Sequence, residues 1–222
     1  MEGEAIALDR EVIGADQRIA GCVRVTVTEM LATRFIVPHL PRFHRQHPGI
    51  TLELECSTRV VNLARREADV ALRLSRPHEE NVVSRRLATV PLSLYAAPAY
   101  LERCGTPPDP DVSLAGQQAI LFADARAFAI ENEWLQGRLD GARIVLRSDS
   151  VSSIYSATLG GLGIALLPVA VAGHDPALVR IPTVSRPAPR VVWQAVHADL
   201  ARSARVRAVV DFLGEIVAPV TE

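Results

Sequence analysis

Three stretches of alternating apolar residues each end at a small group of hydroxyl and acidic residues, and a helical pattern follows each group. The stretches are residues 23–27, 51–55 and 143–147. Side chains of these types accept hydrogen bonds from the unpaired N–H groups of a first helical turn, where the positive end of the helix dipole also lies. In an open α/β sheet, such helix starts gather at the carboxyl ends of the strands. The pattern therefore favours a fold that holds a small, anionic molecule over one that cuts or joins a substrate.

The rest of the chain also alternates between strand and helix patterns, which favours βαβ units and a mainly parallel sheet. We expect strands at about residues 22–28, 50–55, 69–74, 82–87, 91–96, 119–123, 144–146, 163–168, 178–181 and 190–197. We expect helices at about residues 4–13, 59–66, 132–139, 151–159 and 206–216. A further helical stripe contains Pro38 and Pro41, and because proline is tolerated in a first turn, this helix should begin near Ile36 and end before Pro48. Residues 28–34 then form a loop or one short turn.

The composition is that of a globular protein, with 49% hydrophobic and 22% charged residues. A chain of 222 residues buries a substantial core and fits either one α/β domain or two small ones side by side. The formal net charge of −1 argues against a free-standing nucleic-acid binder, which usually has a basic face. All 24 basic residues are arginine, so Schiff-base catalysis and a Walker-type phosphate lysine are excluded.

The cysteines favour a reducing compartment. Cys22, Cys56 and Cys104 are odd in number and lack a C-x-x-C spacing, so they indicate neither a zinc site nor a complete disulfide framework. No basic segment followed by an apolar one opens the chain, and no apolar run reaches about 18 residues. We therefore expect a cytoplasmic protein without a membrane partner.

Motifs of common enzyme classes are missing. The chain contains no G-x-S-x-G motif, and its glycine cluster, residues 160–163, follows a helix and precedes a strand, which is the reverse of a dinucleotide fingerprint. His44 and His47 have helical spacing, but no third metal ligand stands at a convincing distance in the sequence. We expect no catalytic residue, no metal and no cofactor.

Four segments, taken in order, carry a family resemblance. They are residues 21–25, Pro38 and Phe43 with residues 47–54, residues 69–73 and residues 160–168. Together their order and spacing resemble the effector-binding domain of the LysR-type bacterial transcriptional regulators. The similarity extends from about residue 15 to about residue 215.

The resemblance implies two Rossmann-like α/β subdomains of the periplasmic-binding-protein type, with the ligand in a cleft between them and two chain crossings as a hinge. The crossings should lie near residues 95–98 and 193–197. The implied division is residues 1–20 for the end of a linker helix, residues 21–96 plus 195–222 for the first subdomain, and residues 97–194 for the second.

The resemblance also implies partners. The family carries an N-terminal winged helix-turn-helix domain and a long dimerising linker helix, and neither is complete in this chain. DNA would therefore be bound only through a domain absent from this chain. We expect a small-molecule effector and a homodimer or higher homo-oligomer, with the helix around residues 38–47 near the partner.

Most of the effector-contacting candidates follow from the same resemblance, whereas Arg73, Phe122 and Phe128 follow from their position and chemistry. Thr58 is the strongest, because the family places a hydroxyl at the start of its second helix, facing the ligand. Thr28 and Glu29 follow the first strand, where the family also contacts effectors. The full set is Thr28, Glu29, Ser57, Thr58, Arg73, Phe122, Phe128, Ser148, Asp149 and Ser150.

Each candidate also has an ordinary structural explanation. The hydroxyl groups and Asp149 could simply cap helices. Arg73 could bind an effector carboxylate in bidentate fashion or pair on the surface with Asp69 or Glu67. Glu29 could repel an anion, accept hydrogen bonds from an amino or hydroxyl group, or be a solvated loop acid.

Phe122 and Phe128 could form an apolar wall or pack in the core. Two other classes of protein share this architecture: a solute-binding protein of a transport system and a small two-domain α/β enzyme. Fold similarity alone does not separate them from a regulatory domain.

Overall fold

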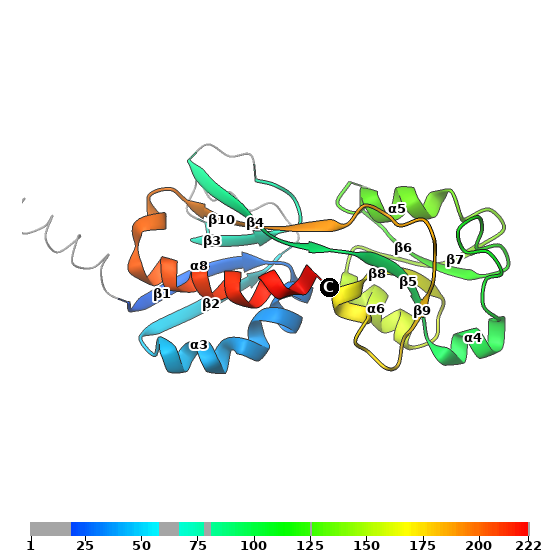
Figure 1. The fold of residues 1–222 in the computed structure, drawn as a ribbon, viewed down its shortest axis with the longest axis horizontal. Helices are drawn as coiled ribbons and strands as arrows, with labels where there is room; N and C mark the ends of the chain where they lie inside the picture. The colour runs from blue at the N-terminus through cyan, green and yellow to red at the C-terminus, as the bar shows by residue number, and fades with distance from the viewer. Residues whose placement is uncertain (1–18, 58–66, 78–80, 125, 222) are drawn as a thin grey trace, which may run out of the picture. The chain divides into compact units, whose positions relative to one another are not determined.

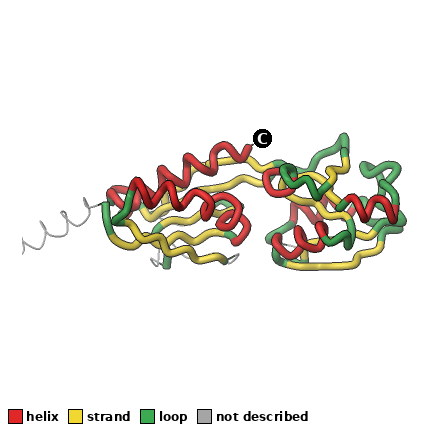
Figure 2. Tube along the Cα trace, turned by 90° about the horizontal axis from the view of Figure 1, so that it is seen from below, coloured by secondary structure: helices red, strands yellow, loops and turns green. Residues whose placement is uncertain are grey.

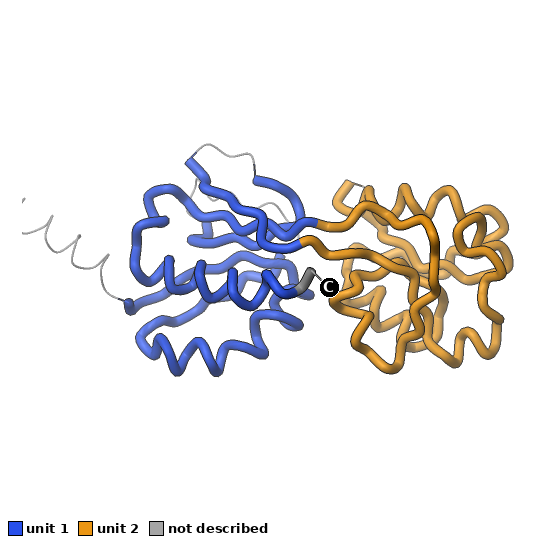
Figure 3. Tube along the Cα trace, in the orientation of Figure 1, with its two compact units in different colours: residues 1–88, 191–220 blue, residues 89–190, 221–222 orange. Residues whose placement is uncertain are grey.

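The computed structural model describes residues 19–57, 67–77, 81–124 and 126–221. The chain divides into two compact α/β units (Figures 1 and 3). Unit 1 comprises Met1–Ala88 and Val191–Val220, and unit 2 comprises Thr89–Arg190 with the last two residues. In both units helices lie against the strands of a sheet (Figure 2). The α/β class with two subdomains expected from the sequence is confirmed, although both sheets also contain antiparallel pairs.

Unit 1 is built on a five-stranded sheet of order β2-β1-β3-β10-β4. The strands are β1 (Gly21–Val27), β2 (Ile50–Cys56), β3 (Val70–Arg73), β4 (Val82–Val90) and β10 (Arg190–His197). β1 runs parallel to both β2 and β3, whereas β10 runs antiparallel to β3. Since β1, β2 and β3 are parallel, their carboxyl ends share one edge of the sheet.

A continuous helical path follows β1 from Glu29, which corrects the expectation of a loop or one short turn over residues 28–34. It consists of α2 (Glu29–Leu31), a π-helical turn (Ala32–Ile36), a 3-10 turn (Val37–His39) and α3 (Leu40–Gln46). Pro38 and Pro41 cannot donate α-helical hydrogen bonds, so the chain widens and then tightens around them. The N–H of Val37 donates to the carbonyl of Ala32, and that of Leu40 to the carbonyl of Val37.

The C-terminal helix α8 (Ala204–Val217) covers the sheet of unit 1 with an apolar stripe (Figure 1). Val206, Val209 and Leu213 are buried at helical spacing. α8 also packs beside α3, where the ring centroids of Phe43 and Phe212 lie 4.6 Å apart. The amphipathic pattern expected for residues 206–216 therefore buries its apolar face as predicted.

Unit 2 is built on a second five-stranded sheet, of order β7-β6-β8-β5-β9. The strands are β5 (Leu92–Ala96), β6 (Gln118–Phe122), β7 (Arg143–Ser148), β8 (Ile164–Pro168) and β9 (Val179–Ile181). β6 runs parallel to β7 and β8, and β5 runs antiparallel to β8 and β9. The helices are α4 (Pro98–Cys104), α5 (Ala129–Gln136), α6 (Val151–Leu159) and α7 (Val169–Ala172).

The sequence pattern did not indicate α4 or α7. Pro98 occupies the first turn of α4, where its missing N–H costs nothing, and Gly105 follows the helix with φ +77°. α7 is a single turn whose apolar residues have no helical period to recognise. The helices expected at residues 4–13 and 59–66 lie outside the described residues.

The chain passes from unit 1 to unit 2 between Ala88 and Thr89 and returns between Arg190 and Val191. Both crossings precede the boundaries expected at residues 96/97 and 194/195. The first does so because β5 pairs along most of its length with β8 and β9 of unit 2. Within the described part of the chain, no helix has the length and apolarity needed to cross a bilayer.

Candidate functional site

The carboxyl ends of β1, β2 and β3 bring together residues from three separate stretches of the sequence. Val27 stands opposite Cys56, and Thr26 stands opposite Ala71. Thr28 and Ser57 directly follow β1 and β2, and Arg73 is the last residue of β3. These three candidates therefore lie at one edge of the unit 1 sheet. Thr58, the strongest candidate from the sequence, lies outside the described residues.

Arg73 connects the ends of these three strands. Its Nη1 donates to the carbonyl of Ser57 at 2.8 Å, and its Nη2 donates to the hydroxyl of Thr26. Thr26 is fully buried and Arg73 is 9% exposed. Burial lowers the pKa of the Arg73 guanidinium below its usual value, while the charge of Glu55 acts in the opposite direction.

Arg73 does not form the surface ion pair that the sequence allowed as the alternative to effector binding. Asp69 instead accepts a hydrogen bond from the backbone N–H of Arg24 at 2.8 Å. Among the described residues no carboxylate forms an ion pair with Arg73. The carbonyl and hydroxyl acceptors satisfy N–H groups, but the buried positive charge has no ion-pair partner among the described residues. A planar guanidinium that is buried without an ion-pair partner suits bidentate binding of a carboxylate.

Thr28 and Glu29 occupy the start of the helical path after β1. Thr28 is half-buried at the N-cap position, yet its side chain makes no capping hydrogen bond, contrary to the sequence expectation. Glu29 is exposed, whereas the next two residues, Met30 and Leu31, are buried. The Thr28 hydroxyl is therefore not used as a helix cap.

The corresponding edge of unit 2 contains the serine candidates. Phe122 of β6 stands opposite Ser148 of β7. The Ser148 hydroxyl accepts from the N–H of Ser150 at 3.1 Å, and the Ser150 hydroxyl accepts from the N–H of Ser153 at 3.2 Å, which caps α6. Asp149 is exposed. Each serine hydroxyl thus accepts one backbone N–H, although only Ser150 caps α6, and each hydroxyl still carries a proton to donate.

Phe122 and Phe128 pack on each other. Their ring centroids lie 3.9 Å apart with an interplanar angle of 11°. Phe122 is 2% exposed and Phe128 is 6% exposed. Such burial favours the core-packing explanation that the sequence had left open, because little of either ring is available to a ligand.

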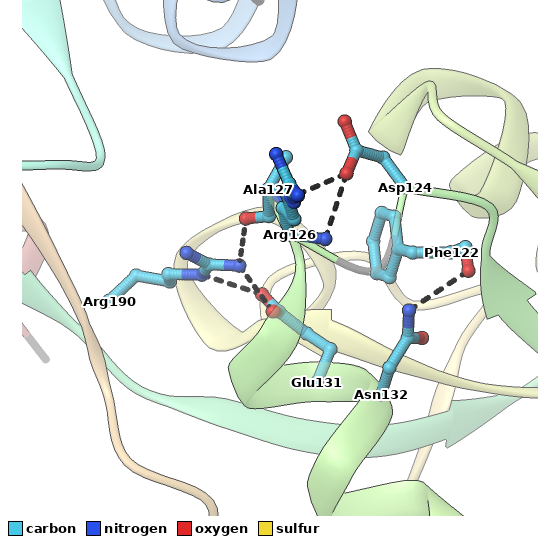
Figure 4. Close-up of polar contacts among 7 residues, drawn as sticks. All are labelled: Phe122, Asp124, Arg126, Ala127, Glu131, Asn132 and Arg190. Atoms are coloured by element: carbon cyan, nitrogen blue, oxygen red, sulfur yellow. Dashed lines mark hydrogen bonds and ion pairs between the residues drawn. The ribbon is translucent and has the colours of Figure 1, made fainter.

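A buried ion pair that the sequence did not indicate lies in the same part of unit 2 (Figure 4). The Nε of Arg190 donates to Glu131 Oε1 at 2.8 Å, and its Nη2 donates to Glu131 Oε2 and, at 2.7 Å, to the carbonyl of Ala127. The Arg190 Cζ lies 5.6 Å from the ring centroid of Phe128. No local motif links two residues that stand 59 positions apart.

Asp124 holds the same turn from its other side (Figure 4). Its Oδ1 accepts from the N–H groups of Ala127 and Arg126, each at 2.9 Å. These bonds, that of Ala127 first, lower the pKa of the Asp124 carboxyl below its usual value. Ala127 is therefore held through both its N–H and its carbonyl.

Histidines and other metal-ligand side chains do not converge. In the described ranges, no three His, Cys, Asp or Glu residues are grouped so that they could hold a metal ion. His44 is exposed, and the ring of His47 lies 5.1 Å from that of Phe43. His197 is buried and lies 3.5 Å from Asp199. These contacts agree with packing and surface roles.

Known proteins resemble the chain over nearly its whole length. The family model "LysR substrate binding domain" matches residues 16–218. An HTH-type transcriptional regulator of Xanthomonas campestris pv. campestris is 30% identical over 203 residues, which cover 87% of this chain and 58% of that protein. The regulator CrgA of Neisseria meningitidis serogroup C is 27% identical over 223 residues, covering 96% of this chain and 72% of CrgA.

A solved structure agrees with this similarity. The regulatory domain of Neisseria meningitidis CrgA, a LysR-type transcriptional regulator, has a TM-score of 0.77 and 25% identity, covering 89% of this chain and 99% of that domain. The chain spans 58% of the length of the first curated relatives that it matches. The chain belongs to the LysR substrate binding domain family, and its role is to sense an effector.

Proposed function

We propose that the effector is a small anion whose carboxylate binds Arg73. The supporting observation is the buried Arg73 guanidinium, which is bonded only to neutral oxygens of Ser57 and Thr26 within the described residues. A buried cation without a counter-ion is costly, and an anionic ligand offsets that cost on binding. The carboxylate accepts from the N–H groups of Arg73 that the protein does not use.

The neighbouring candidates supply the other contacts of unit 1. The Thr28 hydroxyl makes no capping bond, so it can donate to an effector oxygen. Exposed Glu29 would accept hydrogen bonds from an amino or hydroxyl group of the effector and would repel a second carboxylate. Ser57 directly follows β2, and Thr58 follows Ser57. This set favours a monocarboxylate with a hydroxyl or amino substituent over a dicarboxylate.

In unit 2 we propose effector contacts from Ser148, Asp149 and Ser150. Both serine hydroxyls already accept a backbone N–H, which fixes their oxygens and leaves their protons as donors. Removing such a proton donor should weaken effector binding more than it weakens the fold. Phe122 and Phe128 would support this edge through packing.

For the whole protein we propose an effector-responsive transcription factor. Its matched relatives are HTH-type transcriptional regulators, and LysR-type regulators have been solved in full-length form. DNA would be bound through an N-terminal helix-turn-helix domain outside this chain. The whole protein would act in the cytoplasm as a homodimer or higher homo-oligomer. Effector binding would shift the population of conformations, without chemistry on the effector.

A thermal-shift panel tests the anionic site. The panel contains benzoate, salicylate, succinate and 2-oxoglutarate, with benzamide and succinamide as neutral analogues, all at millimolar concentration. A true ligand raises the melting temperature according to mass action, and we expect this for a carboxylate and not for its amide. Arg73→Gln should abolish the rise, whereas Arg24→Gln, which removes an exposed arginine paired with Glu53, should not.

Two results would contradict the proposal. Stabilisation of the Arg73→Gln variant equal to that of the unchanged protein would remove Arg73 from the site, as would a panel in which no carboxylate stabilises the protein. Conversion of a bound carboxylate to product, followed by NMR over a day, would contradict the sensor function itself.

A further inference from the structure

The strand β10 carries two residues that belong to different sites. Its first residue, Arg190, pairs with Glu131 of α5 in unit 2. Trp193 of the same strand stands opposite Arg73 of β3 in unit 1. Only Val191 and Val192 separate the two, and Val192 is fully buried. A shift of the backbone at Arg190 would therefore be passed along β10 to Trp193, the strand neighbour of Arg73.

The start of β10 is anchored by a bidentate ion pair. The two carboxylate oxygens of Glu131 both accept from Arg190, and the side chains are 4% and 11% exposed. Arg190 also donates to Ala127, next to Phe128, and the N–H of Asn132 in α5 donates to the carbonyl of Phe128. One guanidinium thus joins β10, α5 and the turn at residues 126–128 (Figure 4).

Burying such a pair contributes little net stability, because desolvation of both charges offsets their attraction. Its bidentate geometry instead fixes the start of β10 against α5 within unit 2. Trp193 is half-buried, and the Cζ of Arg76 lies 5.4 Å from the centroid of its ring, so its surroundings report on this part of β10.

From these contacts we propose that Glu131 and Arg190 are positioning residues for effector binding: their ion pair fixes the start of β10 and thereby sets the surroundings of Arg73 through Trp193. This inference rests on the proposed anionic site at Arg73. Neither residue touches the effector. Breaking the pair changes the affinity for the effector and the exposure of Trp193 while Arg73 itself is unchanged.

The experiment uses the Trp134→Phe protein, in which Trp193 is the single tryptophan. Acrylamide quenching of Trp193 is measured without ligand in Glu131→Gln and in Arg190→Lys. Glu215→Gln is the matched control, because it breaks an exposed pair of 2.7 Å with Arg42 in unit 1. We expect both test variants to increase quenching and the control to leave it unchanged, with circular dichroism confirming that all variants are folded.

The second readout is the Kd for the panel carboxylate that stabilises the unchanged protein most. Coupling between sites is commonly worth about 5-fold or more in affinity, and we expect at least that loss in Glu131→Gln and Arg190→Lys. Arg190→Lys keeps the charge, so it remains informative if Glu131→Gln fails to fold.

Unchanged quenching in both variants overturns the inference, as does increased quenching with an unchanged Kd. If no carboxylate binds the unchanged protein, the anionic site fails and the effector part of the inference fails with it. Quenching of Trp193 needs no ligand, so it still tests whether the ion pair fixes the start of β10. Failure of the anionic site is thereby distinguished from failure of the positioning role.

Discussion

Trp193 and Arg73 stand directly opposite each other across the antiparallel pair β10 and β3. Arg73, the residue proposed to bind the effector, is thus paired with Trp193 of β10, the strand in which the chain returns from unit 2. Arg73 is also bonded to the ends of β1 and β2. Binding of an anion at Arg73 would therefore act on four strands of unit 1, which is a direct route from occupancy to a change in backbone position.

Removing the Thr26 hydroxyl should lower the free energy of unfolding only in a protein that retains Arg73. Thr26→Val leaves a buried charged donor without its acceptor, and we expect a loss of about 1–3 kcal/mol in the free energy of unfolding. In an Arg73→Met background the same change should cost much less, because no donor remains unpaired. Urea unfolding of the double-mutant cycle measures the difference. Equal costs in both backgrounds would show that the bond is not the cause.

Gly163 should tolerate no side chain. A Cβ at this position would lie 2.5 Å from the backbone carbonyl oxygen of Gln118, so β6 or β8 would have to move. We expect Gly163→Ala to lower the free energy of unfolding by about 1–3 kcal/mol. Gly137→Ala is the control, because its Cβ would meet no atom within 4 Å and its φ is −68°. Urea denaturation should show no loss there, and similar losses at both positions would contradict the steric explanation.

Ser150 should have separable roles in folding and binding. Ser150→Ala removes the cap of α6 and should cost about 1 kcal/mol in stability by urea unfolding. Ser156→Ala, at an exposed position inside α6, should be neutral or slightly stabilising. If Ser150 also donates to the effector, Ser150→Gly, which retains most of the capping, should still weaken effector binding. Unchanged affinity in Ser150→Gly would leave Ser150 as a cap alone.

Asp124 should make folding sensitive to acid. Its pKa in the folded state is lowered by the N–H groups of Ala127 and Arg126. A lowered folded pKa gives stability that is present above the unfolded value of about 4 and is lost as the pH falls through the folded value. The unchanged protein should therefore lose more stability than Asp124→Asn between about pH 5 and pH 2. Thermal unfolding across this range measures the slopes, and parallel curves would show that Asp124 contributes nothing.

The sequence predicted those features that depend on local pattern. Alternating residues such as Val23 and Val25 predicted a strand, and the cluster at residues 148–150 predicted a helix cap, which the structure places at Ser150, because capping needs only neighbours within one turn. Local reasoning was wrong over residues 28–34, where Pro38 suggested a helix start. The chain instead used π and 3-10 turns to continue through the proline.

Features that depend on distant residues could not be predicted. Arg73 was a candidate from its position at the end of a strand, but its bonds to Thr26 and Ser57 follow from sheet order. The pair of Glu131 and Arg190 joins positions 59 residues apart and leaves no periodic or motif signal. Thr58 remains a prediction, since it lies outside the described residues.

The central claim is that Arg73 binds an anionic effector, and isothermal titration tests it most directly. The panel carboxylate that stabilises the protein is titrated into the unchanged protein, into Arg73→Met and into the Arg24→Met control. Removing one partner of a buried charge pair costs about 2–5 kcal/mol, so the Kd should rise by about 30-fold or more in Arg73→Met alone. An affinity of Arg73→Met equal to that of the unchanged protein would contradict the account.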